Sequence, residues 1–145
     1  MHATRFAIGI IGAAAAATTL LAGRTVSAQP AKTVWEGVFT IEQAARGQSS
    51  YQKECASCHG AALEGDGAFA PALIAEPFTE RWRDGTVGEL LILVQTSMPK
   101  EQPATLGADV YADIVTYLLK MNNYPAGQTE LGKDIAQSKD IRFRR

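Results

Sequence analysis

The sequence predicts an all-α protein, and three observations lead to that prediction. Apolar residues recur at helical spacing in the stretches 41–55, 87–97 and 108–121. A break containing glycine or proline follows each stretch. Alternation of apolar and polar residues never extends beyond a few positions, so strands are not expected. The 145 residues suffice for one ordinary domain with additional segments.

Residues 1–28 have the layout of a secretory signal peptide. Arg5 places a positive charge near the start, residues 6–22 are apolar and small, and residues 26–28 offer the small side chains that a signal peptidase requires. A retained membrane anchor is the alternative, because an apolar run of roughly 17 residues is near the shortest that spans a bilayer. We expect cleavage, since the run is rich in alanine and glycine and a suitable cleavage site follows it.

The charge of the mature chain limits its partners. Cleavage before residue 29 leaves 12 basic and 15 acidic side chains, a net charge of −3. This balance gives no reason to expect nucleic-acid binding, which would need a basic face. A domain of this length has a small core, so a large apolar cofactor would supply much of what it buries.

The lead segment 29–39 carries Trp35 and Phe39, which are expected to lie over the folded body. The first helix begins after Thr40, whose side chain fits a capping box with Gln43. Glycine within a helix costs about 1 kcal/mol relative to alanine. Gly47 therefore predicts a point where another helix comes very close, the alternative being a glycine that is merely tolerated.

The stretch 55–59, Cys-Ala-Ser-Cys-His, is the attachment signature of a c-type haem. Residues three apart share a helix face, so Cys55 and Cys58 can form thioethers to the two vinyl groups of one porphyrin. His59 then directs its imidazole at the iron as the proximal ligand. Such thioethers are made outside the bacterial cytoplasmic membrane, which agrees with an export signal and a periplasmic location. Gly60 is suited to end the helix in a left-handed conformation.

Other uses of the two cysteines fit less well. A disulfide across a two-residue spacer would be strained and would close little chain entropy. A thioredoxin-like redox pair needs alternating strands and helices around it, whereas both flanks here read as helical. Structural zinc needs about four ligands, and His59 is the only histidine left in the mature chain. We therefore predict one covalent haem c.

A loop rich in glycine and proline is expected after Gly60. The apolar residues expected to fold from it over a haem face are Phe69, Leu73 and Ile74. Residues 76–84 are expected to form a short helical turn, in which Trp82 and the arginines beside it would hydrogen-bond the haem propionates. An exposed charged turn with one packed tryptophan is the equal alternative.

The next helix begins with a capping box of Thr86 and Glu89 and stops before Pro99. Met98 is thereby placed in an extended loop, from which its thioether can reach the iron opposite His59. Ligation by Met and His raises the reduction potential.

Met121 is the other methionine of the mature chain. It lies on the apolar stripe of the helix 108–121, so it is expected to fill the core rather than to bind iron. Residues 122–125 end this helix. The remaining segment, 127–145, is expected to be a polar, loosely attached and mostly solvated tail.

The whole pattern resembles class I cytochromes c across residues 42–124. The matching residues are Gly47, Tyr51, 55–60, 71–73, Met98, Pro99 and 111–118. The resemblance implies a class I cytochrome c fold, with three to five helices around one haem and the first helix crossing the last where Gly47 meets Tyr117. It also implies that the carbonyl of Pro71 accepts the imidazole proton of His59, which fixes the ring.

Two further pieces, 34–40 and 124–127, are similar to small bacterial periplasmic cytochromes that occur with quinoprotein (PQQ-dependent) dehydrogenases. This similarity implies redox proteins as partners, with a quinoprotein dehydrogenase as electron donor and an oxidase or another cytochrome as acceptor.

The predicted organisation is a signal peptide (1–28), a lead segment (29–39), a cytochrome c domain (40–126) and a tail (127–145). The predicted function is periplasmic transfer of one electron, without catalytic residues. One alternative is a permanent subunit of a dehydrogenase or oxidase complex, docked through the Trp35 lead and the basic tail. The other is a haem enzyme or gas sensor with an open sixth position, which the lack of a second histidine in the mature chain disfavours.

Overall fold

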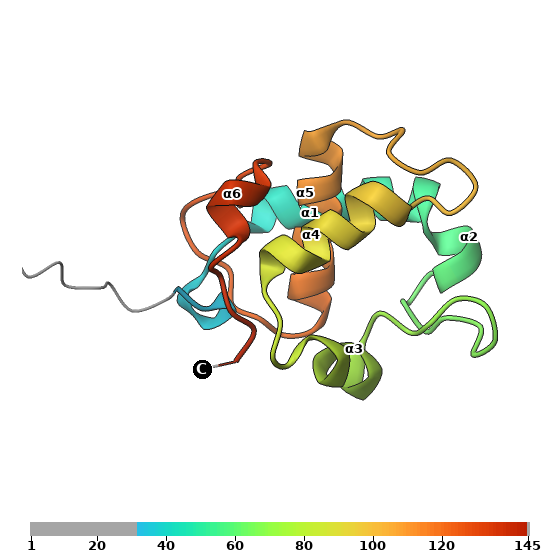
Figure 1. Ribbon diagram of the computed structural model, residues 1–145, viewed down its shortest axis with the longest axis horizontal. Coiled ribbons are helices and arrows are strands. Elements are labelled where there is room, and N and C mark those ends of the chain that lie inside the picture. The colour runs from blue at the N-terminus through green and yellow to red at the C-terminus, as the bar shows by residue number, and fades with distance from the viewer. Residues whose placement is uncertain (1–31, 145) are drawn as a thin grey trace, which may run out of the picture.

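The computed structural model describes residues 32–144, and this part of the chain is helical. Figure 1 shows the elements, which are η1 (Val34–Glu36), α1 (Ile41–Glu54), α2 (Ala56–His59), α3 (Ala75–Trp82), α4 (Val87–Ser97), α5 (Ala108–Met121) and α6 (Ile135–Ser138). The only strand-like pairings between residues 32 and 144 are isolated bridges from Arg142 to Thr33 and to Thr86. The prediction of an all-α protein is therefore confirmed.

Local sequence signals set the starts of α4 and α1. The Thr86 side chain accepts the N–H of Glu89, and the Glu89 side chain accepts the N–H of Thr86, as the predicted capping box requires. At the start of α1 only half of such a box forms. Thr40 accepts the N–H of Gln43, but the Gln43 amide turns away and exchanges two hydrogen bonds with the main chain of Leu131, at 2.7 and 3.0 Å.

The two longest helices, α1 and α5, cross at Gly47 (Figure 1). A Cβ atom on Gly47 would overlap the main-chain carbonyl of Asp113, so only glycine permits this approach. The crossing is the one predicted, but its partner is Asp113 rather than Tyr117. Tyr117 packs one turn further along, against Tyr51, with ring centroids 5.3 Å apart.

The first helix is shorter than predicted. It ends at Glu54, and Cys55 leaves helical geometry with φ −125° and ψ −32° before α2 begins at Ala56. The attachment stretch is therefore a separate short turn set against the end of α1. Gly60 ends this turn with a positive φ of 78° but with ψ at 152°, which lies outside the left-handed helical region.

The expectation of a loose, solvated tail is wrong for residues 127–144. Leu131, Ile141 and Phe143 are buried in the core. The main chain of Ile141 accepts the N–H of Val87 at 2.9 Å, and the N–H of Phe143 donates to Gly85 at 3.2 Å. The segment is polar in composition, but its large apolar residues pack against the core, with Leu131, Ile141 and Phe143 buried and Ile135 partly buried. Figure 1 shows its end beside the lead.

The described part of the lead, residues 32–39, lies against the body as expected. Val34 and Phe39 are fully buried, whereas Trp35 is partly exposed and packs edge-on against Tyr124, with ring centroids 5.0 Å apart. The predicted signal peptide lies outside the described residues. Within residues 32–144, none of the helices has the length and hydrophobicity needed to cross a membrane.

Candidate haem-binding site

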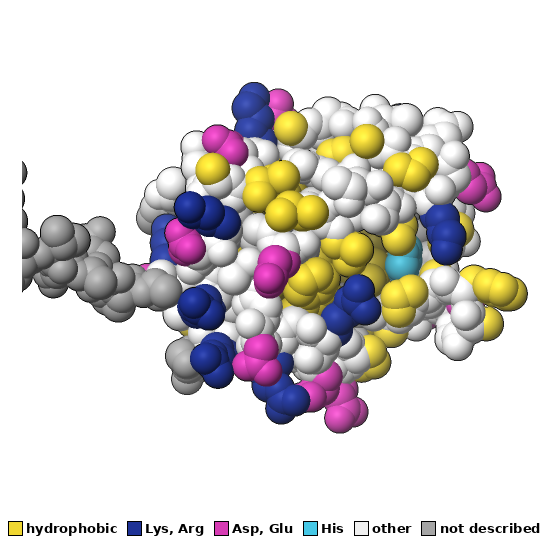
Figure 2. Space-filling view, in the orientation of Figure 1, with side chains coloured by type: hydrophobic (Ala, Val, Ile, Leu, Met, Phe, Trp, Pro, Cys, Tyr) yellow, Lys and Arg dark blue, Asp and Glu magenta, His cyan; other side chains and the backbone are white. Residues whose placement is uncertain are grey.

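A hollow with hydrophobic walls opens on one face of the molecule. In Figure 1 the ribbons of α2, the loop that follows it, α3 and α4 surround this region. Figure 2 shows hydrophobic side chains inside the hollow and a histidine at its wall. His59 is the histidine of the described residues, and 92% of its surface is buried. The hollow has the apolar character that a porphyrin needs.

Both cysteines of the attachment stretch are free thiols. Cys58 is exposed, whereas Cys55 is half-buried and packs against the core. Burial, with a smaller contribution from the charge of Glu54, raises the pKa of the Cys55 thiol to about 11. The Cys55 thiol is therefore protonated at neutral pH, and a protonated thiol is a weak nucleophile.

A hydrogen bond fixes the orientation of His59. Its Nδ1 lies 3.0 Å from the carbonyl oxygen of Pro71, which can only accept, so Nδ1 carries the proton. The other ring nitrogen, Nε2, then has its lone pair available as a metal ligand. Between residues 32 and 144, three or more His, Cys, Asp or Glu side chains are nowhere grouped as a metal site.

The loop that presents Pro71 is built around Asp66. One oxygen of its carboxylate accepts the N–H groups of Ala68, Phe69 and Ala70 at 2.8–2.9 Å. These hydrogen bonds, the one from Ala70 contributing most, hold the pKa of Asp66 below its ordinary value. Phe69 is 91% exposed, and its place over a haem face remains a prediction.

We expect the stabilising effect of Asp66 to disappear in acid. Because its pKa is lower in the folded protein, its carboxylate contributes stability above its ordinary pKa of 3.8 and loses that contribution as the pH falls through the folded value. The variant Asp66→Asn should therefore be less stable than the unaltered protein at pH 6, and the difference should shrink between pH 4 and pH 2. Urea unfolding at a series of pH values measures it. A difference that does not change with pH would contradict this account.

Met98 has the extended backbone predicted for it, with φ −128° and ψ 151°. Its N–H donates to Val94 in the last turn of α4, and its carbonyl accepts the hydroxyl of Tyr111 at 2.8 Å. Its side chain is partly buried against the core. Met121 is also partly buried, but it belongs to the last turn of α5.

Trp82 is packed in the way expected for an exposed charged turn that carries one packed tryptophan. It is 9% exposed and lies against Phe143, with ring centroids 5.9 Å apart. Arg81 stacks over its ring at 5.6 Å, and Arg83 forms an ion pair with Glu80 at 2.8 Å. A contact between Trp82 and haem propionates remains a prediction.

Two polar residues, Asn122 and Tyr51, support the site through hydrogen bonds that the sequence did not reveal. Asn122 is buried and donates to Leu73, while its side-chain oxygen accepts the N–H of Ala75, so α5 holds the end of the Pro71 loop. Tyr51 donates from its hydroxyl to the carbonyl of Gly60, next to His59, at 2.8 Å. In the sequence, Asn122 indicated only the end of a helix, and Tyr51 was a residue of the family resemblance to which no contact was assigned.

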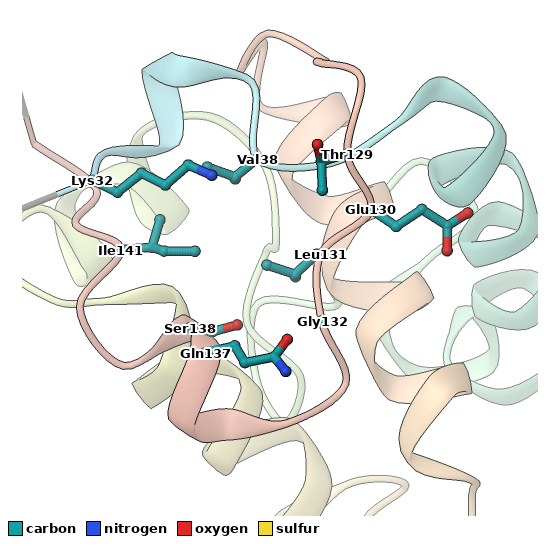
Figure 3. Close-up of a pocket in the computed structure, with 9 residues that line it drawn as sticks. All are labelled: Lys32, Val38, Thr129, Glu130, Leu131, Gly132, Gln137, Ser138 and Ile141. Carbon is teal, nitrogen blue, oxygen red and sulfur yellow. The ribbon is translucent and has the colours of Figure 1, made fainter.

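A separate pocket, of about 190 Å³, lies away from His59. Figure 3 shows it between the lead and the last segment of the chain, with Val38, Leu131 and Ile141 among its walls. Ser138 also faces it, and the Ser138 hydroxyl is buried without a hydrogen-bond partner among the described residues. The pocket is too small and too distant from the cysteines to belong to the haem site.

The model of the family described as "Cytochrome C oxidase, cbb3-type, subunit III" matches residues 42–118, which is more than half of the chain. The chain belongs to this family of c-type cytochromes. The predicted class of c-type cytochrome and the covalent haem c are therefore confirmed, and the family points to an electron carrier rather than an enzyme.

A search of the curated proteins finds no match. Among solved structures, a chain in the crystal structure of the sulfane dehydrogenase SoxCD from Paracoccus pantotrophus is similar, with 22% identity and a TM-score of 0.46. The match covers 72% of this chain and 60% of that chain. Cytochromes of the family are typically exported and take redox proteins as partners.

Proposed function

We propose that the protein is a periplasmic carrier of one electron in which Cys55 and Cys58 hold the haem and His59 and Met98 bind its iron. When bound, haem c supplies a couple between ferric and ferrous iron. The observation that supports this assignment best is the hydrogen bond from His59 to Pro71, because it frees Nε2 for a metal on a ring that cannot rotate.

The chain's own residues then keep the site unchanged during transfer. His59 is held by Pro71, and Met98 is held at both its N–H and its carbonyl, so neither ligand needs to move. Cys58 is exposed, so partners would approach the haem edge beside its thioether. Encounters of this kind use small, weak interfaces, which suit rapid exchange of partners.

For the partners, we propose a periplasmic dehydrogenase of the quinoprotein class as donor and a terminal oxidase or another cytochrome as acceptor. The similarity of residues 34–40 and 124–127 to cytochromes that occur with such dehydrogenases supports the donor. Export by the segment 1–28 is part of this proposal. The overall negative charge of the mature chain argues against nucleic acid as a partner.

A visible absorption spectrum tests the ligands. The reduced protein should be low-spin and indifferent to carbon monoxide, because Met98 occupies the sixth position. The variant Met98→Ala should bind carbon monoxide readily, and Met121→Ala should behave like the unaltered protein. If the unaltered protein bound carbon monoxide as readily as Met98→Ala, ligation of the iron by Met98 would be refuted. A haem enzyme or gas sensor would then be the better functional assignment than an electron carrier.

A permanent subunit of an oxidase or dehydrogenase complex is the second candidate, and the description of the matching family as an oxidase subunit favours it. Gel filtration of extracts that contain the native partners separates the two candidates. A mobile carrier would elute near its own mass of 15.5 kDa or less, whereas a permanent subunit would elute far above it.

A further inference from the structure

We infer that Tyr111 is a positioning residue that holds Met98 in place through the main chain, an inference that rests on the function proposed above. Tyr111 lies in the first turn of α5 and is 2% exposed. Its hydroxyl donates to the carbonyl of Met98 at 2.8 Å and accepts the N–H of Leu106 at 3.3 Å. One side chain thus binds both ends of the segment 98–106.

This segment has few other attachments. Residues 100–105 are all exposed, and their hydrogen bonds are local, from the N–H of Gln102 to Pro99 at 2.9 Å and from the hydroxyl of Thr105 to Gln102 at 2.7 Å. Such bonds shape the segment but do not join it to the body. Tyr111 makes that connection from a rigid helix.

Met98 is consequently held by two helices. The last turn of α4 accepts its N–H through Val94, and α5 donates to its carbonyl through Tyr111. With both main-chain groups bonded, the side chain leaves a fixed point. Loss of the Tyr111 hydroxyl would free the carbonyl of Met98. Met98 would then detach from the iron more often while the fold stayed intact.

The experiment compares Tyr111→Phe with Tyr51→Phe in the haem-loaded protein. Both variants lose a tyrosine hydroxyl that donates to a main-chain carbonyl at 2.8 Å, but Tyr51 acts at Gly60 on the His59 side. We expect both to unfold at a lower temperature. We expect only Tyr111→Phe to bind carbon monoxide more tightly in the reduced state, by about fivefold, which corresponds to about 1 kcal/mol.

The other possible outcomes contradict either the positioning role of Tyr111 or the ligation by Met98. Carbon monoxide affinity unchanged in Tyr111→Phe, or raised equally in Tyr51→Phe, would overturn the positioning role while leaving Met98 as the ligand. Equal affinity in the unaltered protein and Met98→Ala would instead overturn the proposed ligation itself. The measurement therefore separates failure of the inference from failure of the proposed function.

Discussion

Replacing Gly47 with alanine is expected to destabilise the protein by about 3 kcal/mol or more, although helix propensity alone predicts a gain of about 1 kcal/mol. The new Cβ would overlap the carbonyl of Asp113, which belongs to the main chain of α5 and cannot rotate away. The two helices would have to separate along their crossing. Because α1 and α5 are the two longest helices of the described residues and both contribute to the core, we expect the loss to be global rather than local.

The matched control is Gly107→Ala, at the start of α5. A Cβ there meets only a Val110 methyl group, at 4.0 Å, and the backbone has an ordinary φ of −64°. This variant should stay within about 1 kcal/mol of the unaltered protein. Urea unfolding followed by far-ultraviolet circular dichroism measures both. A Gly47→Ala protein more stable than the unaltered one would show that the helices do not meet at this residue.

Replacing Phe143 with alanine is expected to cost about 3–5 kcal/mol, an effect that a solvated tail could not produce. Phe143 is 3% exposed. Its ring lies within 6.0 Å, centroid to centroid, of three others, those of Phe78, Trp82 and Tyr124. Removal of the ring would leave a cavity at the junction of α3, the end of α5 and the tail.

Phe69→Ala is the control for this substitution, because it removes the same side chain from a position that is 91% exposed. We expect its free energy of unfolding to change by no more than about 0.5 kcal/mol. Equilibrium unfolding of both variants in urea makes the comparison. If Phe143→Ala lost less than about 1 kcal/mol, the tail would not be part of the core in solution.

The chemistry-bearing residues were accessible from the sequence because their signals are local. The cysteines and His59 occupy five consecutive positions, and the proline after Met98 is sufficient to place that methionine in extended backbone. The ends of the helix 108–121 were predicted for the same reason, since caps and breaks act within a few residues. Their use in binding haem iron remains a proposal, which the carbon monoxide experiment tests.

The hydrogen bonds that hold these elements in place could not be predicted from local signals, because each joins residues far apart in the chain. Gln43 looked like half of a capping box, but its amide pairs with Leu131, 88 positions later. Tyr111 entered only as one residue of the matching stretch 111–118, yet its hydroxyl donates to the carbonyl of Met98, 13 positions earlier. Composition alone made the tail look solvated, since most of its residues are polar.

By itself, then, the sequence determined the helical class, the attachment stretch, the two ligand candidates and most helix ends, because these depend on spacing, caps and breaks within a few residues. Only the tertiary structure decided that Gly47 packs against the main chain of Asp113, that Phe143 is buried among other aromatic rings and that Tyr111 hydrogen-bonds to Met98. These contacts depend on which surfaces meet once the helices pack. A polar or apolar residue carries no local mark of the distant partner that will satisfy it.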